Sequence, residues 1–204
     1  MTTLFYMPGA CSLAPHIVLE WIGAPFEAKR VRREAPELLA VNPAGAVPVL
    51  VEDDGWSLTQ AGAILDYLAH KHPEADLLGG KGLRADAERH RWSSFVTGDL
   101  HPAFVPMFAP TRYTTDASAE GQQAVKTAAQ ALVRKRLGLL DAHLANRAWI
   151  LDRRSVIDAY VFPMISWASG LLPGGVSDLR NVSALHDRLA ADVSVQKVLA
   201  SEAA

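Results

Sequence analysis

The one cysteine of the chain, Cys11, stands where a thiol could take part in chemistry. It follows a short apolar run at residues 4–6 and comes just before a helical pattern that opens near Ser12. The start of a helix carries a partial positive charge and free N–H groups, and both stabilise a thiolate, whether it belongs to the cysteine or to a bound ligand. A buried structural cysteine fits the same spacing, so the position alone leaves both interpretations open.

A second candidate is the pair Val47-Pro48, which opens another short apolar run. X–Pro bonds in folded proteins are cis only about 5–6% of the time. A cis bond here would leave the backbone N–H and C=O of Val47 unpaired by a sheet, and an extended peptide could pair with them as an added strand. The alternative is an ordinary trans proline at the start of a strand, which sheets permit.

A third candidate is Thr59-Gln60-Ala61, which opens a further helical pattern. The N-terminus of a helix is suited to an anion such as a carboxylate. The alternative is a plain capped helix that binds nothing. These features make one site only if the surrounding elements bring them together.

The elements up to about residue 78 predict an α/β unit, because short apolar runs alternate with helical patterns. The order is β-α-β, then β-β-α. The predicted strands are 4–6, 26–31, 47–51 and 56–58. The first predicted helix runs to Ile22, with Ser12 as a possible N-cap. The second begins after Thr59, which is its expected N-cap. Residues 36–39 allow a helical turn at most.

After a glycine-rich joint at residues 79–82, the pattern is helical almost throughout. Prolines at positions 102, 106 and 110 should kink the first of these helices or end it early, since each removes a backbone donor and crowds the preceding turn. The predicted helices are 83–101; 121–144, with a buried stripe of Val125, Ala129, Leu132, Val133, Leu137, Leu140 and Leu144; one opened by a capping box at 155–158; 182–190; and 194–200. We therefore expect an α/β domain at 1–78, a linker at 79–82 and an all-α domain at 83–204.

Composition narrows the class of protein. Twenty Lys and Arg residues against 22 Asp and Glu residues give a net charge of -2. This charge indicates neither a groove that binds nucleic acid nor an anionic membrane surface as a binding partner. A single cysteine permits no internal disulfide and suits a reducing compartment. No signal-peptide pattern opens the chain, and the uncharged segment 159–177 is broken by Pro, Gly and Ser. We expect a cytoplasmic protein that binds no nucleic acid, membrane or metal.

Taken in order, these pieces resemble a glutathione S-transferase, and the bacterial beta class most closely. The most specific stretch is 4–13, with Cys11 and Ser12, and the resemblance covers nearly the whole chain. The other matching pieces are His16; 40–43 with Val47-Pro48; 58–60 with 63–64 and 66–68; Leu100-His101 with Phe104, Pro106 and Phe108; 149–150; and 158–160 with Phe162.

The resemblance implies a thioredoxin-like β-α-β-α-β-β-α domain with a mixed four-stranded sheet, followed by an all-α domain. Glutathione would be a co-substrate, with no tightly bound cofactor. It would lie extended, with its cysteinyl part paired to the backbone of Val47 beside a cis Pro48. Its γ-glutamyl end would be held by Gln60 and the backbone at Ala61.

The resemblance also implies that Tyr6, Cys11 and Ser12 surround the glutathione sulfur and that His101 reaches it from the helical domain. A second substrate would lie between the domains, against such residues as Phe104 and Phe108. Homodimers are the rule in the family.

The chain departs from the family pattern in three places. Ala61 stands where a serine is usual, which removes one hydroxyl from the γ-glutamyl site. The segment 32–39 is short, so no basic residue aligns securely with the one that holds the glycine carboxylate of glutathione. Ser94 stands where relatives often have Asn.

The leading hypothesis is transfer of glutathione to small hydrophobic electrophiles, with thiol–disulfide or peroxidase side activity through Cys11. One alternative is a specialised glutathione-dependent dehalogenase, ether-cleaving enzyme or isomerase. The other is a non-catalytic dimer that binds glutathione or another ligand.

Overall fold

The structure is a computed structural model that describes residues 1–204. Its first part is built on a four-stranded sheet. The strand order is β2-β1-β3-β4; β1 is parallel to β2, and the other two pairs are antiparallel. This β-α-β-α-β-β-α order with a mixed sheet confirms the predicted fold. The elements are β1 Thr2–Tyr6, α1 Leu13–Ile22, β2 Phe26–Arg30, α2 Pro36–Val41, β3 Val49–Val51, β4 Ser57–Thr59 and α3 Ala61–Lys71.

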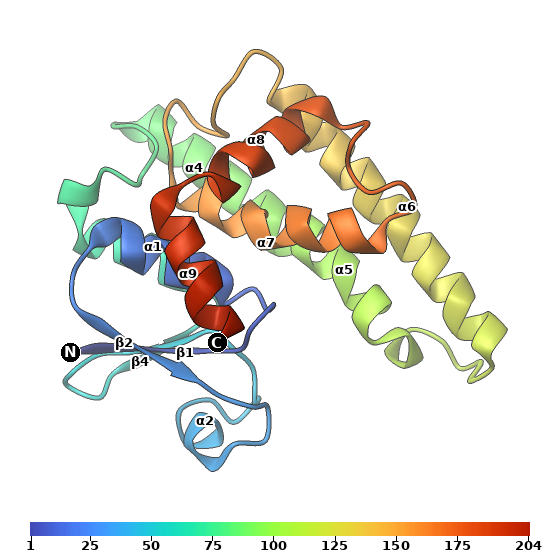
Figure 1. Cartoon of the computed structure of the whole chain (residues 1–204), viewed down its shortest axis with the longest axis horizontal. Helices are drawn as coiled ribbons and strands as arrows, with labels where there is room; N and C mark the ends of the chain where they lie inside the picture. The colour runs from blue at the N-terminus through green and yellow to red at the C-terminus, as the bar shows by residue number, and fades with distance from the viewer.

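The two faces of the sheet are covered by different helices, because successive side chains of a strand point to opposite sides. Leu4 and Tyr6 of β1 belong to the main core together with α1 and α3. Phe5 instead belongs to a small cluster that includes Val49 of β3 and Leu38 of α2. In Figure 1, α1 and α2 lie on opposite sides of the sheet.

The second part is helical, with α7 at its centre (Figure 1). As predicted, α7 opens with a capping box between Ser155 and Asp158, and most of its residues are buried. The last helix, α9, returns to pack against α1. The helices are α4 Leu83–Phe95, α5 His101–Phe108, α6 Ala119–His143, α7 Val156–Leu171, α8 Arg180–Ala190 and α9 Val193–Ala203.

The helix with the recurring prolines is interrupted at one point only. A π-helical segment, Val96–Leu100, joins α4 to α5 and precedes Pro102. A π-turn places an extra residue in the turn, which gives room to a proline ring that would crowd the preceding carbonyl of a regular helix. Helix α5 then continues through Pro106 and ends at Phe108, before Pro110.

Three local predictions are wrong. Residues 36–41 form the six-residue helix α2, because Pro36 favours a helix start and Leu38 is buried under the sheet. Thr59 ends β4 and does not cap α3, whose N-cap residue is Gln60. Leu132 of α6 is 41% exposed, because the buried side of that helix is centred on the row of Val133.

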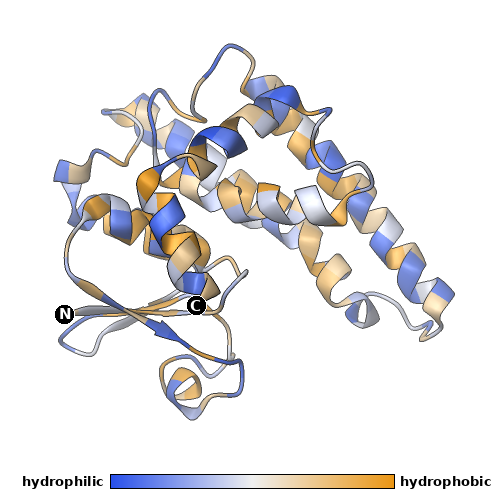
Figure 2. Cartoon of the chain, in the orientation of Figure 1, coloured by the Kyte–Doolittle hydropathy of each residue, from blue (hydrophilic) through white to orange (hydrophobic).

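No helix of the structure combines the length and the apolar character that crossing a membrane requires. Figure 2 shows hydrophilic residues recurring along α6 and α8, whereas α7 is mostly apolar. This fits the interpretation of α7 as a buried helix inside a helical domain.

Candidate active site

A cavity of about 530 Å³ lies between the sheet part and the helical part. Its walls combine the loop before α1, the connection between α2 and β3, and the start of α3 with residues of α4, the π-helical segment, α5 and α7. The residues at its wall are Cys11, Asn42, Ala44, Ala46, Val47, Pro48, Thr59, Gln60, Ala61, Gly62, Ala63, Asp66, His90, Ser93, Thr97, His101 and Tyr160. Three features that are far apart in the sequence, at Cys11, Val47-Pro48 and Gln60-Ala61, thus share one cavity.

The backbone of Val47 lies outside the sheet. The Val47-Pro48 bond is cis, as predicted, and β3 begins only at Val49, two residues later than predicted. The N–H of Val47 has no hydrogen-bond acceptor within the chain, and its carbonyl is contacted only by the thiol of Cys11, with Sγ 3.6 Å from the oxygen. Since sheet groups left unpaired can add a strand, an extended peptide could bind here.

The start of α3 presents free donors to the same cavity. The first intrahelical bond is donated by the N–H of Ile64, so the N–H groups of Ala61, Gly62 and Ala63 have no partner. Gln60 has a φ of 72°, an unfavourable backbone conformation for a residue other than glycine that costs on the order of 1–3 kcal/mol. Free N–H groups and the helix dipole together suit a carboxylate.

The thiol of Cys11 is protonated at neutral pH. Burial raises its pKa to about 11, and a backbone hydrogen bond offsets only part of that rise. The raised pKa favours the neutral thiol for Cys11, and stabilisation of a ligand thiolate at the start of α1 stays a prediction. The helix begins beyond Ser12, and Cys11, which is partly buried at the cavity wall, loses part of the solvation of its charged form.

Ser12 and Tyr6 do not line the cavity. The hydroxyl of Ser12 is buried and bonded to the backbone of Met7, accepting from its N–H at 3.1 Å and donating to its C=O at 3.2 Å. Tyr6 is buried with its ring 5.1 Å from the ring of His16, which in turn pairs with Glu202 at 2.8 Å. In this structure both residues serve local packing.

His101 and Tyr160 meet at the cavity wall. Nδ1 of His101 lies 3.2 Å from the hydroxyl of Tyr160. Burial lowers the pKa of His101, so the imidazole is neutral at pH 7. Burial, with a smaller contribution from nearby Cys11, raises the pKa of Tyr160 well above that of an ordinary phenol. The pair is therefore uncharged and holds protons that it can donate as hydrogen bonds.

Comparison with known proteins identifies the family. Residues 1–70 match the model described as glutathione S-transferase, N-terminal domain. The chain is 42% identical over 207 residues to the glutathione S-transferase GST-4.5 of Xanthomonas campestris pv. campestris, and the match covers 98% of each chain. The chain belongs to the glutathione S-transferase family.

Solved structures agree in fold and in class. A bacterial beta-class glutathione S-transferase of Sphingomonas chungbukensis is 37% identical, with 98% of each chain covered and a TM-score of 0.84. A sphingomonad glutathione S-transferase solved in complex with glutathione is 34% identical, with 98% of each chain covered and a TM-score of 0.86. The chain is thus a glutathione S-transferase enzyme that resembles the bacterial beta class.

The predicted wall for the second substrate of the transferase is only partly exposed. Phe104 is fully buried and packs on Trp167, whereas Phe108 is 54% exposed and stacks near Phe104 with ring centroids 6.4 Å apart. Neither phenylalanine lines the 530 Å³ cavity. Trp167 touches both rings and donates from Nε1 to the carbonyl of Gly9 at 2.8 Å, which ties α7 to the loop before Cys11.

Sequence reasoning did not single out Tyr160 or Trp167 as site residues. Both belong to α7, a helix whose residues look uniformly buried from the sequence. A helix that is apolar all round gives no periodic signal to mark the side chains that face a cavity. The available signal for Tyr160 was its place in a stretch that matches the family, beside the capping residue Asp158.

Proposed function

We propose that this transferase binds glutathione extended in the 530 Å³ cavity and transfers its sulfur to small hydrophobic electrophiles. One observation carries the proposal: the unpaired backbone of Val47 and the free N–H groups at the start of α3 open into the same cavity as Cys11 and His101. A tripeptide with a central thiol and a terminal carboxylate is complementary to that arrangement.

The γ-glutamyl and cysteinyl parts of glutathione then have partners. The γ-glutamyl carboxylate accepts hydrogen bonds from the N–H groups of Ala61 and Gly62 and from the side chain of Gln60. The cysteinyl residue pairs its N–H and C=O with the backbone of Val47 as one rung of an added strand. The related sphingomonad structure, solved with glutathione, supports the binding of glutathione by this chain.

The chemistry is a thiolate attack. The thiol loses its proton, the sulfur forms a bond to an electrophilic carbon, and a leaving group departs with the bonding electron pair. Holding the thiolate beside the electrophile raises the reaction rate by proximity. Lowering the pKa of the thiol raises the fraction that is present as the nucleophilic thiolate. The exposed ring of Phe108 and the neighbouring Trp167 offer an apolar surface for a small hydrophobic partner.

Cys11 serves in this proposal as a neutral neighbour of the glutathione sulfur. A disulfide between the two would need a thiolate on one of them and an oxidant as co-reactant. Because the Cys11 thiol keeps its proton at neutral pH, those steps of the predicted thiol–disulfide or peroxidase side activity in which Cys11 is the attacking thiolate would be slow.

Calorimetry with glutathione and a rate assay over a panel of activated aryl halides test the proposal together. Gln60→Asn is the informative variant, since asparagine tolerates a positive φ but is shorter. It should weaken glutathione binding by roughly 2–10-fold through one lost hydrogen bond. Gln123→Asn, on the exposed side of α6, is the matched control. No binding at millimolar glutathione would refute the proposal, and binding without turnover would favour a ligand-binding dimer.

A specialised reaction on one substrate, such as dehalogenation, ether cleavage or isomerisation, is the second candidate. It is favoured by Ala61, which lacks the usual hydroxyl, and by the short segment 32–39. A narrow substrate profile in the same panel would support it, whereas comparable rates over unrelated electrophiles would exclude it.

We also propose a cytoplasmic homodimer with the division into domains at residues 79–82. Large apolar side chains that stay exposed on the single chain include Trp56, Leu132 and Leu139, at 46%, 41% and 51%. Such side chains are candidates for an interface between copies. Light scattering on the purified protein should give twice the mass of the chain, and a mass equal to one chain would contradict the dimer.

A further inference from the structure

We propose that the hydroxyl of Tyr160, and not that of Tyr6, donates the hydrogen bond that stabilises the glutathione thiolate in this protein. The inference rests on the proposed function, because it concerns the sulfur of glutathione bound in the 530 Å³ cavity. It assigns the role of sulfur donor to α7 of the helical part, whereas the sequence resemblance implied that Tyr6, Cys11 and Ser12 surround the sulfur.

Tyr6 is fixed away from the cavity. It ends β1, which is paired on both sides, and its backbone is in register with Arg30 of β2. Its side chain packs against His16 in the main core and does not line the cavity. His16 is itself buried and held by Glu202, so the ring of Tyr6 has no free space to turn toward a ligand.

Tyr160, unlike Tyr6, lies at the cavity wall. It lies in the second turn of α7, whose start is fixed by the capping box of Ser155 and Asp158. It lines the cavity together with Cys11 and His101. A Cβ atom built on Gly62, in the first turn of α3, would lie 3.8 Å from Cε1 of Tyr160. The phenol ring thus stands beside the helix start proposed for the γ-glutamyl carboxylate.

The contact with His101 leaves the phenol proton available. A neutral imidazole has one N–H and one lone pair. In the tautomer with the proton on Nδ1, His101 donates to the oxygen of Tyr160 across the 3.2 Å contact, and the O–H of Tyr160 is free to donate to a sulfur. A chain of this kind, from imidazole to phenol to thiolate, polarises each bond in the same direction and strengthens it.

The same tautomer provides an acceptor for the thiol proton. Nε2 of His101 then carries a lone pair and has no partner within the chain. It takes the proton of the glutathione thiol and later releases it to water, while the sulfur attacks the electrophile and the leaving group departs with its electron pair. Tyr160 keeps its own proton throughout, in agreement with a pKa that burial raises well above that of an ordinary phenol.

The test compares Tyr160→Phe with Tyr6→Phe. For each protein, calorimetry gives the glutathione affinity, and a pH titration of thiolate absorbance gives the pKa of the bound thiol. A hydrogen bond to a charged group is strong enough that Tyr160→Phe should raise the bound thiol pKa by about 1–2 units. The kcat/KM at pH 7 should fall roughly 10–100-fold and should recover as the pH rises through the new pKa. We expect little change in the bound thiol pKa for Tyr6→Phe.

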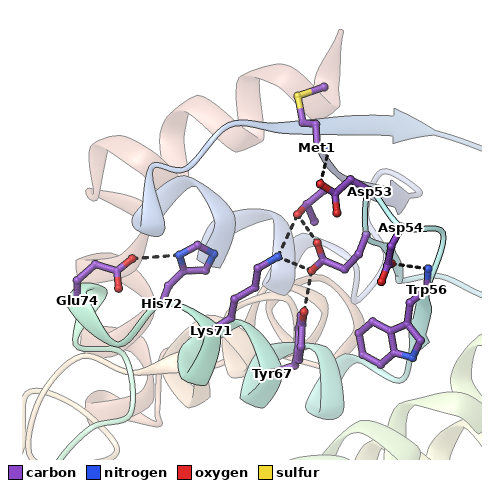
Figure 3. A network of polar contacts seen from close by, with 10 residues as sticks. Met1, Asp53, Asp54, Trp56, Tyr67, Lys71, His72 and Glu74 are labelled. Carbon is purple, nitrogen blue, oxygen red and sulfur yellow. Dashed lines mark hydrogen bonds and ion pairs between the residues drawn. The ribbon is translucent and has the colours of Figure 1, made fainter.

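Tyr67→Phe is the control for loss of a partly buried phenol hydroxyl. Figure 3 shows Tyr67 and Lys71 of α3 pointing at one carboxylate, which is that of Glu52, with distances of 3.0 and 2.6 Å. This network lies outside the cavity, so the variant loses a comparable hydrogen bond and should keep the wild-type pH profile.

The outcomes separate the two proposals. Failure of the wild-type protein to bind glutathione would defeat the proposed function. Normal binding with an unchanged thiol pKa in Tyr160→Phe, or a shifted pKa in Tyr6→Phe, would overturn the assignment alone. If Tyr160→Phe does not fold, a crystal of the wild-type protein with glutathione decides: the Tyr160 oxygen must lie within hydrogen-bond distance of the sulfur, and a sulfur bonded to another hydroxyl would reject the assignment.

Discussion

Burial sets the charge state of the three side chains expected nearest to a bound sulfur. The Cys11 thiol, the His101 imidazole and the Tyr160 phenol all lose solvation in their charged forms, so each is neutral at pH 7. A thiolate that forms among them meets hydrogen-bond donors, the dipoles of helix starts and, until His101 passes the thiol proton to water, one imidazolium. The oriented neutral groups need no reorganisation when the charge develops.

Cys11 should react slowly with alkylating reagents. At pH 7 a thiol of pKa about 11 is ionised to only about 1 part in 10,000, against roughly 3% for an ordinary cysteine thiol. Iodoacetamide should therefore modify the ligand-free protein at least about 100-fold more slowly than a free cysteine, with a rate that keeps rising up to pH 10. Mass spectrometry of timed samples measures this. A rate plateau near pH 8 would show that Cys11 has an ordinary or lowered pKa.

Ala61→Ser should tighten the binding of glutathione. The variant adds a hydroxyl beside the free N–H groups at the start of α3, where the γ-glutamyl carboxylate is proposed to bind. One added hydrogen bond of about 0.5–1.5 kcal/mol corresponds to an affinity gain of roughly 2–12-fold. Calorimetry checks it, with Ala124→Ser on the exposed side of α6 as control. An unchanged affinity would place the carboxylate elsewhere.

The sequence predicted the residues whose role depends on the backbone. Cys11, Val47, Pro48, Gln60 and Ala61 were found because turns, an X–Pro pair and helix starts leave local signals, and the structure brings all of them to one cavity. The sequence did not distinguish a hydroxyl that faces the cavity from one that is bonded internally.

Whether a side chain faces core or cavity depends on contacts between distant segments. Ser12 donates to Met7, five residues away, whereas Tyr6 is held by a pair that ends at Glu202. Phe104 and Phe108 share one helix, yet only the second is exposed. Local pattern cannot separate these cases, because an apolar or aromatic side chain gives the same periodic signal whether it faces the core or a cavity.

At the scale of elements, the start of α7 positions Tyr160 through a buried carboxylate. Asp158 accepts hydrogen bonds from the N–H of Ile150 at 3.0 Å and from both the N–H and the hydroxyl of Ser155 at 2.8 Å. This capping box was predicted from the sequence because its spacing is local. The π-turn before α5 was not, since a proline pattern predicts that a helix is disturbed but not how it adapts.

The capping carboxylate should give the protein a pH-dependent stability. Burial raises the pKa of Asp158 to about 6 in spite of its hydrogen bonds. Because the folded pKa exceeds the unfolded value, this group's stabilising contribution is fully present below about pH 4 and is lost as the pH rises to about 6, by roughly 3 kcal/mol in all. Asp158→Asn should lack this component in urea unfolding measured from pH 4 to 7, whereas exposed Asp152→Asn should keep it. Parallel pH profiles for the two variants would contradict the prediction.

At the scale of the whole molecule, the two parts share one core. A single cluster of 43 buried residues runs from Leu4 in the sheet to Val198 in α9. Figure 1 shows how this arises: α9 returns across the molecule to lie against α1. Polar contacts fix the return: a buried pair between His16 and Glu202, a hydrogen bond from Trp21 to Asp192, and an ion pair between Lys197 and Glu20. The cavity lies between the parts, so its shape depends on this joint core.

A shared core predicts that the parts unfold together, and Glu202→Ala tests it. The variant leaves His16 buried without its partner, which should cost about 1–3 kcal/mol. Hydrogen exchange followed by mass spectrometry can report separately on β1 and on α6, which lie at opposite sides of the molecule (Figure 1). In a cooperative unit both should lose protection by the same free energy, although α6 makes no contact with the substituted residue. Lys135→Ala, at an exposed position of α6, should leave the protection of both β1 and α6 unchanged. A loss confined to β1 would mean that the sheet part opens alone and that the cavity can come apart without unfolding the helices.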